Sequence, residues 1–169
     1  RPDDAMPEMQ AALDLWRAAG ADGAALRTFG TLADQVWAKG DLERAIGLAR
    51  DALEQHRQSP FSDRVARAYV TANLFGMLVE HGELAEAQAL GRQVLPELRE
   101  LNIAHGWSDH FASCMARTGR GDDAVRLVGW ADALRLARGL RRQPNEQRAR
   151  ETALTLARDR ARAADLAHL

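Results

Sequence analysis

The consecutive residues Ser108, Asp109 and His110 are the residue types of a hydrolase triad: a nucleophile, a carboxylate that orients the base, and a base. Their spacing argues against that chemistry. The surrounding sequence favours a helix, and consecutive side chains on a helix point about 100° apart. Three neighbours therefore cannot line up with one another, and we predict no catalytic residue and no enzyme activity.

A metal site is the second chemistry to consider. His110 and Cys114 are four residues apart and could share one helix face, with His105 nearby. A convincing site needs three or four ligands at metal spacing, so a cysteine that faces the interior of a helix pair is the favoured interpretation. The run Gly119-Arg120-Gly121 lacks the Lys-Ser or Lys-Thr of a phosphate-binding loop. We therefore expect no metal and no cofactor.

The composition favours helix along the whole chain. Its 169 residues are 46% hydrophobic and rich in Ala, Leu, Arg and Glu, and no alternating β-branched segment indicates a strand. We therefore expect an all-α protein. The net charge of −1 gives no global reason to expect a nucleic-acid or membrane partner. The single cysteine, the lack of a long apolar run and the lack of a signal-peptide pattern favour a cytoplasmic location.

A short glycine-containing pattern recurs about every forty residues. Gly40-Asp41-Leu42-Glu43-Arg44-Ala45 returns as Gly82-Glu83-Leu84-Ala85-Glu86-Ala87 and, more loosely, at 119–124. In each copy the glycine is expected to end one helix in the left-handed conformation, and an acidic residue or its neighbour is expected to cap the next helix. Repeats of this length predict stacked helical hairpins, because one hairpin cannot bury its apolar face alone.

Apolar residues at helical spacing divide the chain into about eight helices in a single array over residues 1–169. The predicted segments are a half repeat or N-terminal cap helix at 4–19, repeats at 25–58, 63–101 and 105–138, and a C-terminal capping helix at 145–168. Gly20 and Gly23 are expected to end the first helix, whose core stripe includes Trp16. Ser62 and Asn145 are predicted helix caps, and Pro96 is a possible kink.

Eight arginines lie between Arg138 and Arg162 and give the best local case for an anion or nucleic-acid contact. A solvated outer face with a few ion pairs is the favoured interpretation, with Arg148 facing outward and Arg150 towards the neighbouring helices. We therefore expect no direct nucleic-acid contact.

The hinges and small residues together resemble the tetratricopeptide repeat (TPR) family. The first repeat matches at Phe29, Leu32, Ala33, Gly40, Asp41, Ala45 and Ala52, and the third at Phe111, Ala112, Gly119, Ala124 and Ala131. The second has Gly82, Glu83 and Ala87, but places Phe75 and Val94 where small residues are usual. The resemblance implies a right-handed superhelix of stacked antiparallel helix pairs.

In the TPR family, the first helices of the pairs line a concave groove that binds extended peptides or partner helices. The family's groove positions correspond here to Arg27, Thr31, Asp34, Trp37, Tyr69, Asn73, Glu80, Asp109, His110, Ser113 and Arg117. Trp37 is included because it lies one residue past Val36, outside the core stripe. This mixture of charges, aromatic rings and hydrogen-bonding groups suits a polar peptide or a small effector.

The segment 119–169 also resembles the carboxyl-terminal end of TPR domains in large bacterial transcriptional regulators. Those proteins carry an ATPase module and a LuxR-like or winged-helix DNA-binding head. Neither module is visible in this sequence, and the resemblance implies a non-catalytic regulatory or sensor part of such a regulator. The first helix resembles the second half of a repeat, so we expect either a fragment of a longer protein or an N-terminal cap helix. The alternative is a self-association module that forms a homodimer through a terminal helix, such as the helix bearing Met9, Leu13 and Trp16.

Overall fold

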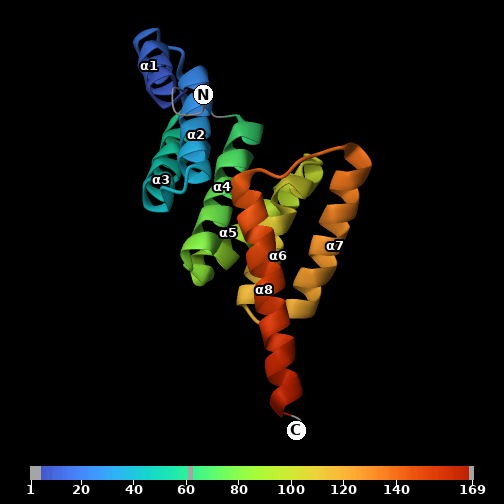
Figure 1. Ribbon diagram of the computed structural model, residues 1–169. Helices are drawn as coiled ribbons and strands as arrows, with labels where there is room; N and C mark the ends of the chain where they lie inside the picture. Colours follow the sequence, from blue (N-terminus) through green and yellow to red (C-terminus); the bar gives the residue numbers. More distant parts are fainter. Residues whose placement is uncertain (1–4, 61–62, 168–169) are drawn as a thin grey trace. The chain divides into compact units, whose positions relative to one another are not determined.

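The computed structural model describes residues 5–60 and 63–167, and all regular structure in these ranges is helical (Figure 1). The elements are α1 (Ala5–Ala18), α2 (Asp22–Ala38), α3 (Leu42–Gln58), α4 (Arg64–His81), α5 (Leu84–Glu100), the 3-10 helix η2 (Ala104–Trp107), α6 (Ser108–Arg117), α7 (Gly121–Arg138) and α8 (Pro144–Ala167). The all-α prediction is confirmed. None of the described helices is long and apolar enough to cross a bilayer.

The chain divides into two compact units, Arg1–Met77 and Leu78–Leu169, with the boundary inside α4. In the first unit α2 packs against both α1 and α3. In the second unit α6, α7 and α8 pack against one another. The single array predicted over residues 1–169 stays a prediction.

The hinge glycines adopt the left-handed backbone predicted for them, with φ of 92° at Gly40 and 97° at Gly82. The predicted capping by the acidic residue is wrong, since neither Asp41 nor Glu83 makes a side-chain cap hydrogen bond. Each instead sits at the centre of an inverse γ-turn, in which the next residue's N–H donates to the glycine carbonyl, at 3.0 Å for Leu42 and 2.8 Å for Leu84. The backbone of the hinge thus satisfies the first helical N–H itself.

Two helix starts differ from the prediction. Gly23 does not end α1 but lies in the first turn of α2, which begins at Asp22. Ser62, the predicted cap of α4, lies outside the described residues, and Asp63 caps this helix by accepting the Ala66 N–H at 2.6 Å. Pro96 lies within α5, which is continuous from Leu84 to Glu100.

The start of α8 also corrects the prediction that Asn145 caps this helix. The helix begins one residue earlier, at Pro144, whose missing N–H costs nothing at the first helical position. The Glu146 carboxylate accepts the Gln143 N–H at 2.8 Å, which is the reciprocal half of a capping box.

The predicted burial is wrong for two tryptophans: Trp16 is exposed and Trp37 is buried. Trp16, placed in the core stripe, is 43% exposed, while its neighbour on the stripe, Leu13, is fully buried. Trp37, placed outside the core, is 1% exposed. Because α2 is covered by α1 on one side and by α3 on the other, it buries a wider arc than one apolar stripe. That arc includes Trp37 as well as Val36.

One core cluster of the second unit, where α6, α7 and α8 meet, is made largely of small side chains. Ala112 and Ala116 of α6 meet Ala124 and Val128 of α7 and Ala153 of α8. Such residues let helix axes approach closely, so that one face of α6 is covered by the other two helices.

Candidate functional site

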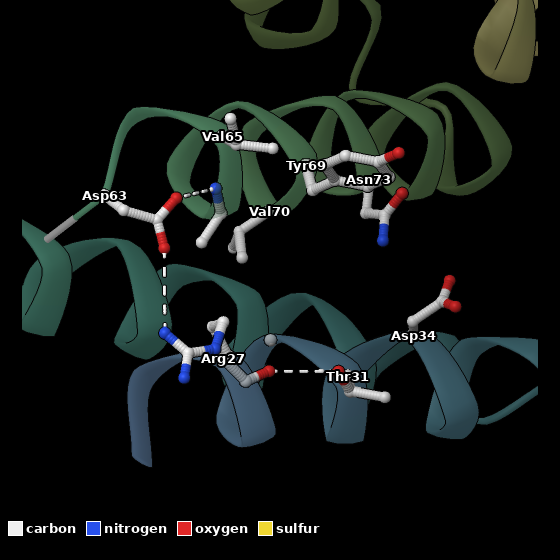
Figure 2. A pocket seen from close by; sticks show the side chains of 10 residues that line it. Arg27, Thr31, Asp34, Asp63, Val65, Tyr69, Val70 and Asn73 are labelled. Carbon is white, nitrogen blue, oxygen red and sulfur yellow. Dashed lines mark hydrogen bonds and ion pairs between the residues drawn. The ribbon is translucent and has the colours of Figure 1, made fainter. Parts of the chain in front are cut away.

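A pocket of about 410 Å³ lies between α2 and the first turns of α4, within the first unit (Figure 2). It is lined by Arg27, Gly30, Thr31, Asp34, Asp63, Val65, Ala66, Tyr69, Val70 and Asn73. At the floor of the pocket, the lack of a side chain at Gly30 lets α2 and α4 lie close together. A Cβ at this position would come within 2.6 Å of Val70 Cγ2. The pocket therefore depends on a glycine at this position.

One end of the pocket carries opposite charges on its two walls. Arg27 of α2 faces Asp63, the residue that precedes α4, with 3.9 Å between Nη1 and Oδ2, and both side chains are about half exposed. A pair this long and this exposed contributes little to stability. The Thr31 hydroxyl donates to the Arg27 carbonyl at 3.0 Å.

The other end combines a carboxylate, an amide and an aromatic ring. Asp34 projects from α2 towards α4, where Tyr69 and Asn73 lie one helical turn apart (Figure 2). The Tyr69 side chain is 44% exposed, and Val65, one turn earlier, is similarly exposed. This end offers an accessible aromatic face beside hydrogen-bonding groups, a combination suited to side chains of a bound polypeptide.

The structure brings together five of the eleven residues predicted to line the groove: Arg27, Thr31, Asp34, Tyr69 and Asn73. Their role in binding stays a prediction. The sequence interpretation did not include Val65 or Asp63. Val65 lies four residues before Tyr69, as Asn73 lies four after it, so helical spacing from Tyr69 was the signal that could have identified it.

Trp37 does not line the groove, which corrects its prediction, because its side chain is buried in the first unit. Asp109, His110 and Ser113 are corrected for a similar reason: packing of α7 and α8 on α6 leaves each of them no more than 2% exposed. They are interior residues of the second unit and offer no surface to a ligand. Arg117 is partly buried at the end of α6.

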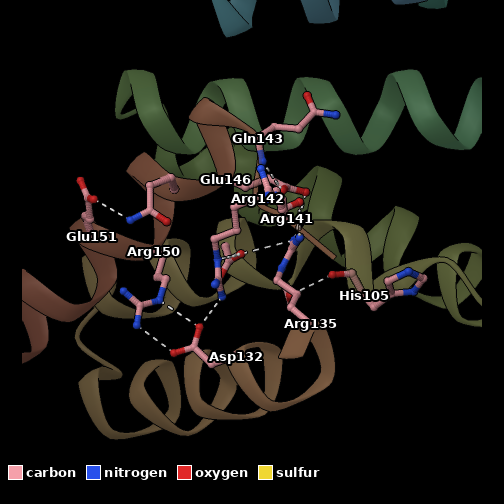
Figure 3. A network of polar contacts seen from close by, with 12 residues as sticks. His105, Asp132, Arg135, Arg141, Arg142, Gln143, Glu146, Arg150 and Glu151 are labelled. Atoms are coloured by element: carbon pink, nitrogen blue, oxygen red, sulfur yellow. Dashed lines mark hydrogen bonds and ion pairs between the residues drawn. The ribbon is translucent and has the colours of Figure 1, made fainter. Parts of the chain in front are cut away.

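The buried Asp109 belongs to a network of charges that joins α6, α7, α8 and the segment before α8. Figure 3 shows the part of this network around Asp132, Arg142 and Arg150. Its carboxylate accepts from Arg142 at 2.9 and 3.2 Å. Arg142 also donates to Asp132 at 2.5 Å, and Asp132 accepts from Arg150 at 3.0 and 2.8 Å. The hydrogen bonds from Arg150 and Arg142 hold the pKa of Asp132 below its usual value.

Arg135 and Arg148 complete this set of ion pairs. Arg135 lies between Asp109, at 3.5 Å, and Glu146, at 3.0 Å. Arg148 donates to the Glu80 carboxylate at 2.8 and 3.3 Å. Its side chain is still 37% exposed, so it lies on a solvated face and makes an ion pair there. Through these ion pairs α8 contacts α7 and the end of α4 within the second unit.

Of the residues first considered for catalysis and metal binding, Ser108, Asp109, His110 and Cys114 are buried and contribute to packing and hydrogen bonding within the second unit. The Ser108 hydroxyl donates to the His105 carbonyl at 2.8 Å, while Asp109 binds Arg142. Burial, aided by the charges of nearby arginines, lowers the pKa of His110 to about 3, so this imidazole is neutral. Burial raises the pKa of the Cys114 thiol. In the described ranges, no three His, Cys, Asp or Glu side chains cluster closely enough to hold a metal.

Helix pairs joined at left-handed glycines define an all-α fold of the TPR-like repeat type, which confirms the predicted fold class. Two solved structures share it, both of nearly identical TPR-like repeats assigned to a putative kinesin light chain of Podosopora anserina, one of them a variant with methionine in place of a glutamine. Each matches with a TM-score of 0.60 and 17% identity, over 99% of this chain and 84% of the other. No protein-family model and no curated protein matches the sequence.

Proposed function

We propose that this chain is a non-catalytic interaction scaffold whose pocket between α2 and α4 binds an extended segment of a partner protein. The observation that carries the proposal is that pocket itself. Two helices that are not neighbours in sequence place Asp34, Tyr69 and Asn73 around one space of about 410 Å³. The TPR-like fold supports the same class of function by analogy.

The lining favours a polypeptide over a purely apolar ligand. Tyr69 supplies a large contact area with few rotatable bonds, which is why tyrosine is common at the centres of interfaces. Arg27 and Asn73 offer donors and an acceptor at the two ends, where the polar backbone of an extended segment needs partners. A bound segment would thus find apolar contact in the middle of the pocket and hydrogen bonds at its ends.

The test begins with the purified 169-residue chain and a phage-displayed library of linear peptides. Selected peptides are then titrated against Tyr69→Ala and against Trp130→Ala, which removes an exposed aromatic side chain of α7 outside the pocket. We expect Tyr69→Ala to weaken binding about tenfold or more, and Trp130→Ala to leave it unchanged. Full affinity in Tyr69→Ala would show that the peptides bind elsewhere and would refute the proposal.

Trp37 is unsuitable for this test although sequence analysis singled it out. Its side chain is among the most deeply buried in the chain, and truncation of such a residue to alanine costs about 3–5 kcal/mol. A loss of binding in that variant would report unfolding rather than a lost contact.

The finer role that we propose is the regulatory or sensor part of a cytoplasmic bacterial transcriptional regulator. It is supported by the resemblance of residues 119–169 to the carboxyl-terminal end of TPR domains in such proteins. The complete gene product would then bind promoter DNA and hydrolyse ATP, and a peptide selected on this chain should change one of these activities. A gene product without an ATPase module and a DNA-binding head would contradict the role.

Self-association is the second candidate, and the outer face of α1 favours it. Leu15 and Trp16 expose large apolar surfaces there, at 69% and 43%. Sedimentation equilibrium should then show a homodimer that Leu15→Glu weakens, whereas Leu140→Glu, at an exposed leucine after α7, should not weaken it. A strictly monomeric wild-type chain at high concentration would exclude this candidate.

A further inference from the structure

We infer that the outer face of α7 pairs with the same face of a second copy of the chain, in an antiparallel arrangement. This outer face is formed by Gly129, Trp130, Ala133, Leu136 and Ala137. It belongs to the second unit and includes neither the pocket between α2 and α4 nor the exposed side chains of α1. It combines large apolar side chains in solvent with a glycine that packing within the chain does not require, and it lies between unpaired charges of opposite sign.

The helix α7 is apolar on two opposite sides. Ala124, Val128 and Ala131 are buried on the side where α6 and α8 pack, and Figure 1 shows both of these helices on one side of α7, which is drawn in orange. On the other side Trp130 is 51% exposed and Leu136 is 86% exposed. A helix that is apolar all round is normally covered all round, and large apolar side chains gathered in solvent mark an interaction site. The outer face therefore has no cover within the described chain.

Gly129 lies in the interior of α7, where glycine is the least favourable residue after proline. A Cβ at this position would meet nothing within 4 Å, so packing within the chain does not explain the glycine. Gly129, Ala133 and Ala137 follow at intervals of four residues and thus form one ridge of the helix. Because the side chains at a contact set how closely two helices approach, this ridge of small residues suits a second helix packed close against it.

The outer face is complementary to itself when two copies run antiparallel. With the two-fold axis at Ala133, Trp130 lies level with Leu136 of the second copy, because both are three residues from the axis. In the same way Gly129 lies level with Ala137 of the second copy. Each large side chain thus meets a large one, each small residue meets a small one, and every contact occurs twice, as an isologous interface requires. A partner of another kind need not share this symmetry.

The charges at the two ends of α7 favour the antiparallel direction. Asp122 lies in its first turn, whereas Arg138 ends the helix and Arg141 follows it. None of these three side chains makes an ion pair with a residue that the structure describes, whereas Arg126 already pairs with Asp123. In an antiparallel pair the acidic end of one copy lies beside the basic end of the other, and the helix dipoles are opposed as well. A parallel pair would bring like charges together.

The test is sedimentation equilibrium of the 169-residue chain over a range of concentrations, with Gly129→Gln and Gly47→Gln as matched variants. Gly47 also lies in open space in the interior of a helix, α3, but one turn from the exposed Glu43 and Asp51 instead of apolar residues. Glutamine is a better helix former than glycine, so thermal unfolding in dilute solution should show both variants at least as stable as the wild type. We expect the dissociation constant of the dimer to rise about tenfold or more in Gly129→Gln and to stay unchanged in Gly47→Gln.

Charge reversal tests the direction of the pair. Asp122→Arg alone, and Arg138→Asp combined with Arg141→Asp, each place like charges at both ends of an antiparallel dimer and should weaken it. In an equimolar mixture of these two variants, opposite charges lie together at both ends, so the mixture should dimerise more strongly than either variant alone.

Three outcomes would overturn the pairing. A wild-type chain that stays monomeric up to about 1 mM forms no specific dimer. A dimer that Leu15→Glu dissociates and Gly129→Gln leaves intact is formed through α1. A dimer that Gly129→Gln weakens, but that the mixture of charge-reversed variants does not restore, is not antiparallel. None of these outcomes depends on peptide binding in the pocket between α2 and α4.

Discussion

Replacement of Asp109 by asparagine is the sharpest test of how the second unit holds together. The carboxylate is 0% exposed and accepts two hydrogen bonds from Arg142, while Arg135 lies 3.5 Å away. The asparagine would keep the shape of the side chain but would leave two guanidinium groups without this counter-charge. Removing one partner of a buried ion pair costs about 3–5 kcal/mol. Because Arg142 also pairs with Asp132, we expect about 3 kcal/mol.

The assay is unfolding in urea followed by circular dichroism, with Asp123→Asn as the control. Asp123 pairs with Arg126 of α7 and with Arg120, which precedes this helix, but the Asp123 side chain is 40% exposed, so its loss should cost less than about 1 kcal/mol. If Asp109→Asn unfolds at the same urea concentration as Asp123→Asn, burial does not strengthen the Asp109 pair. The buried network would then add no more stability than an exposed ion pair does.

Three further predictions follow from burial in the same structure. The pKa of His110 is lowered to about 3 in the folded chain, so below pH about 6.5 the unfolded chain binds a proton that the folded chain does not. The free energy of unfolding should therefore decrease as the pH is lowered from about 6.5 to about 3, by up to about 1.4 kcal/mol per pH unit. His110→Gln should flatten this dependence in unfolding measured across pH. Gly30→Ala should cost about 1–3 kcal/mol because its Cβ would meet Val70, whereas Gly47→Ala, with open space around it on α3, should stabilise by up to about 1 kcal/mol; equal unfolding midpoints for these two would contradict the close approach. Cys114, buried and with a raised pKa, should react with a thiol reagent slowly in the folded chain and quickly in urea, and rapid labelling without denaturant would refute its burial.

Local sequence signals were sufficient to predict the helices. The spacing of apolar residues located every long helix, and the glycines at 40, 82 and 119 located the turns between them. Both signals act over a few residues, because a left-handed backbone and a helical face depend on near neighbours. The γ-turns at Asp41 and Glu83 were missed because an acidic residue before a helix is also the usual sign of a side-chain cap.

The site was only partly predictable because it depends on which helices cover each other. Tyr69 and Asp34 follow from the register of a TPR groove. Asp109 carries equally suitable chemistry, but Arg142 reaches it from 33 residues away in sequence, and no local pattern predicts that pairing. Trp37 was misplaced for the same reason, since the contact of α2 with two helices decides its burial.

Amide chemical shifts of the 169-residue chain can show whether the pocket between α2 and α4 receives a polypeptide segment. On titration with a selected peptide, the largest changes are expected on α2 and α4 between Arg27 and Asn73, and Tyr69→Ala should move the midpoint of the titration to about tenfold higher peptide concentration or more. Changes confined to α7 and α8, or an unchanged midpoint in Tyr69→Ala, would contradict binding in this pocket.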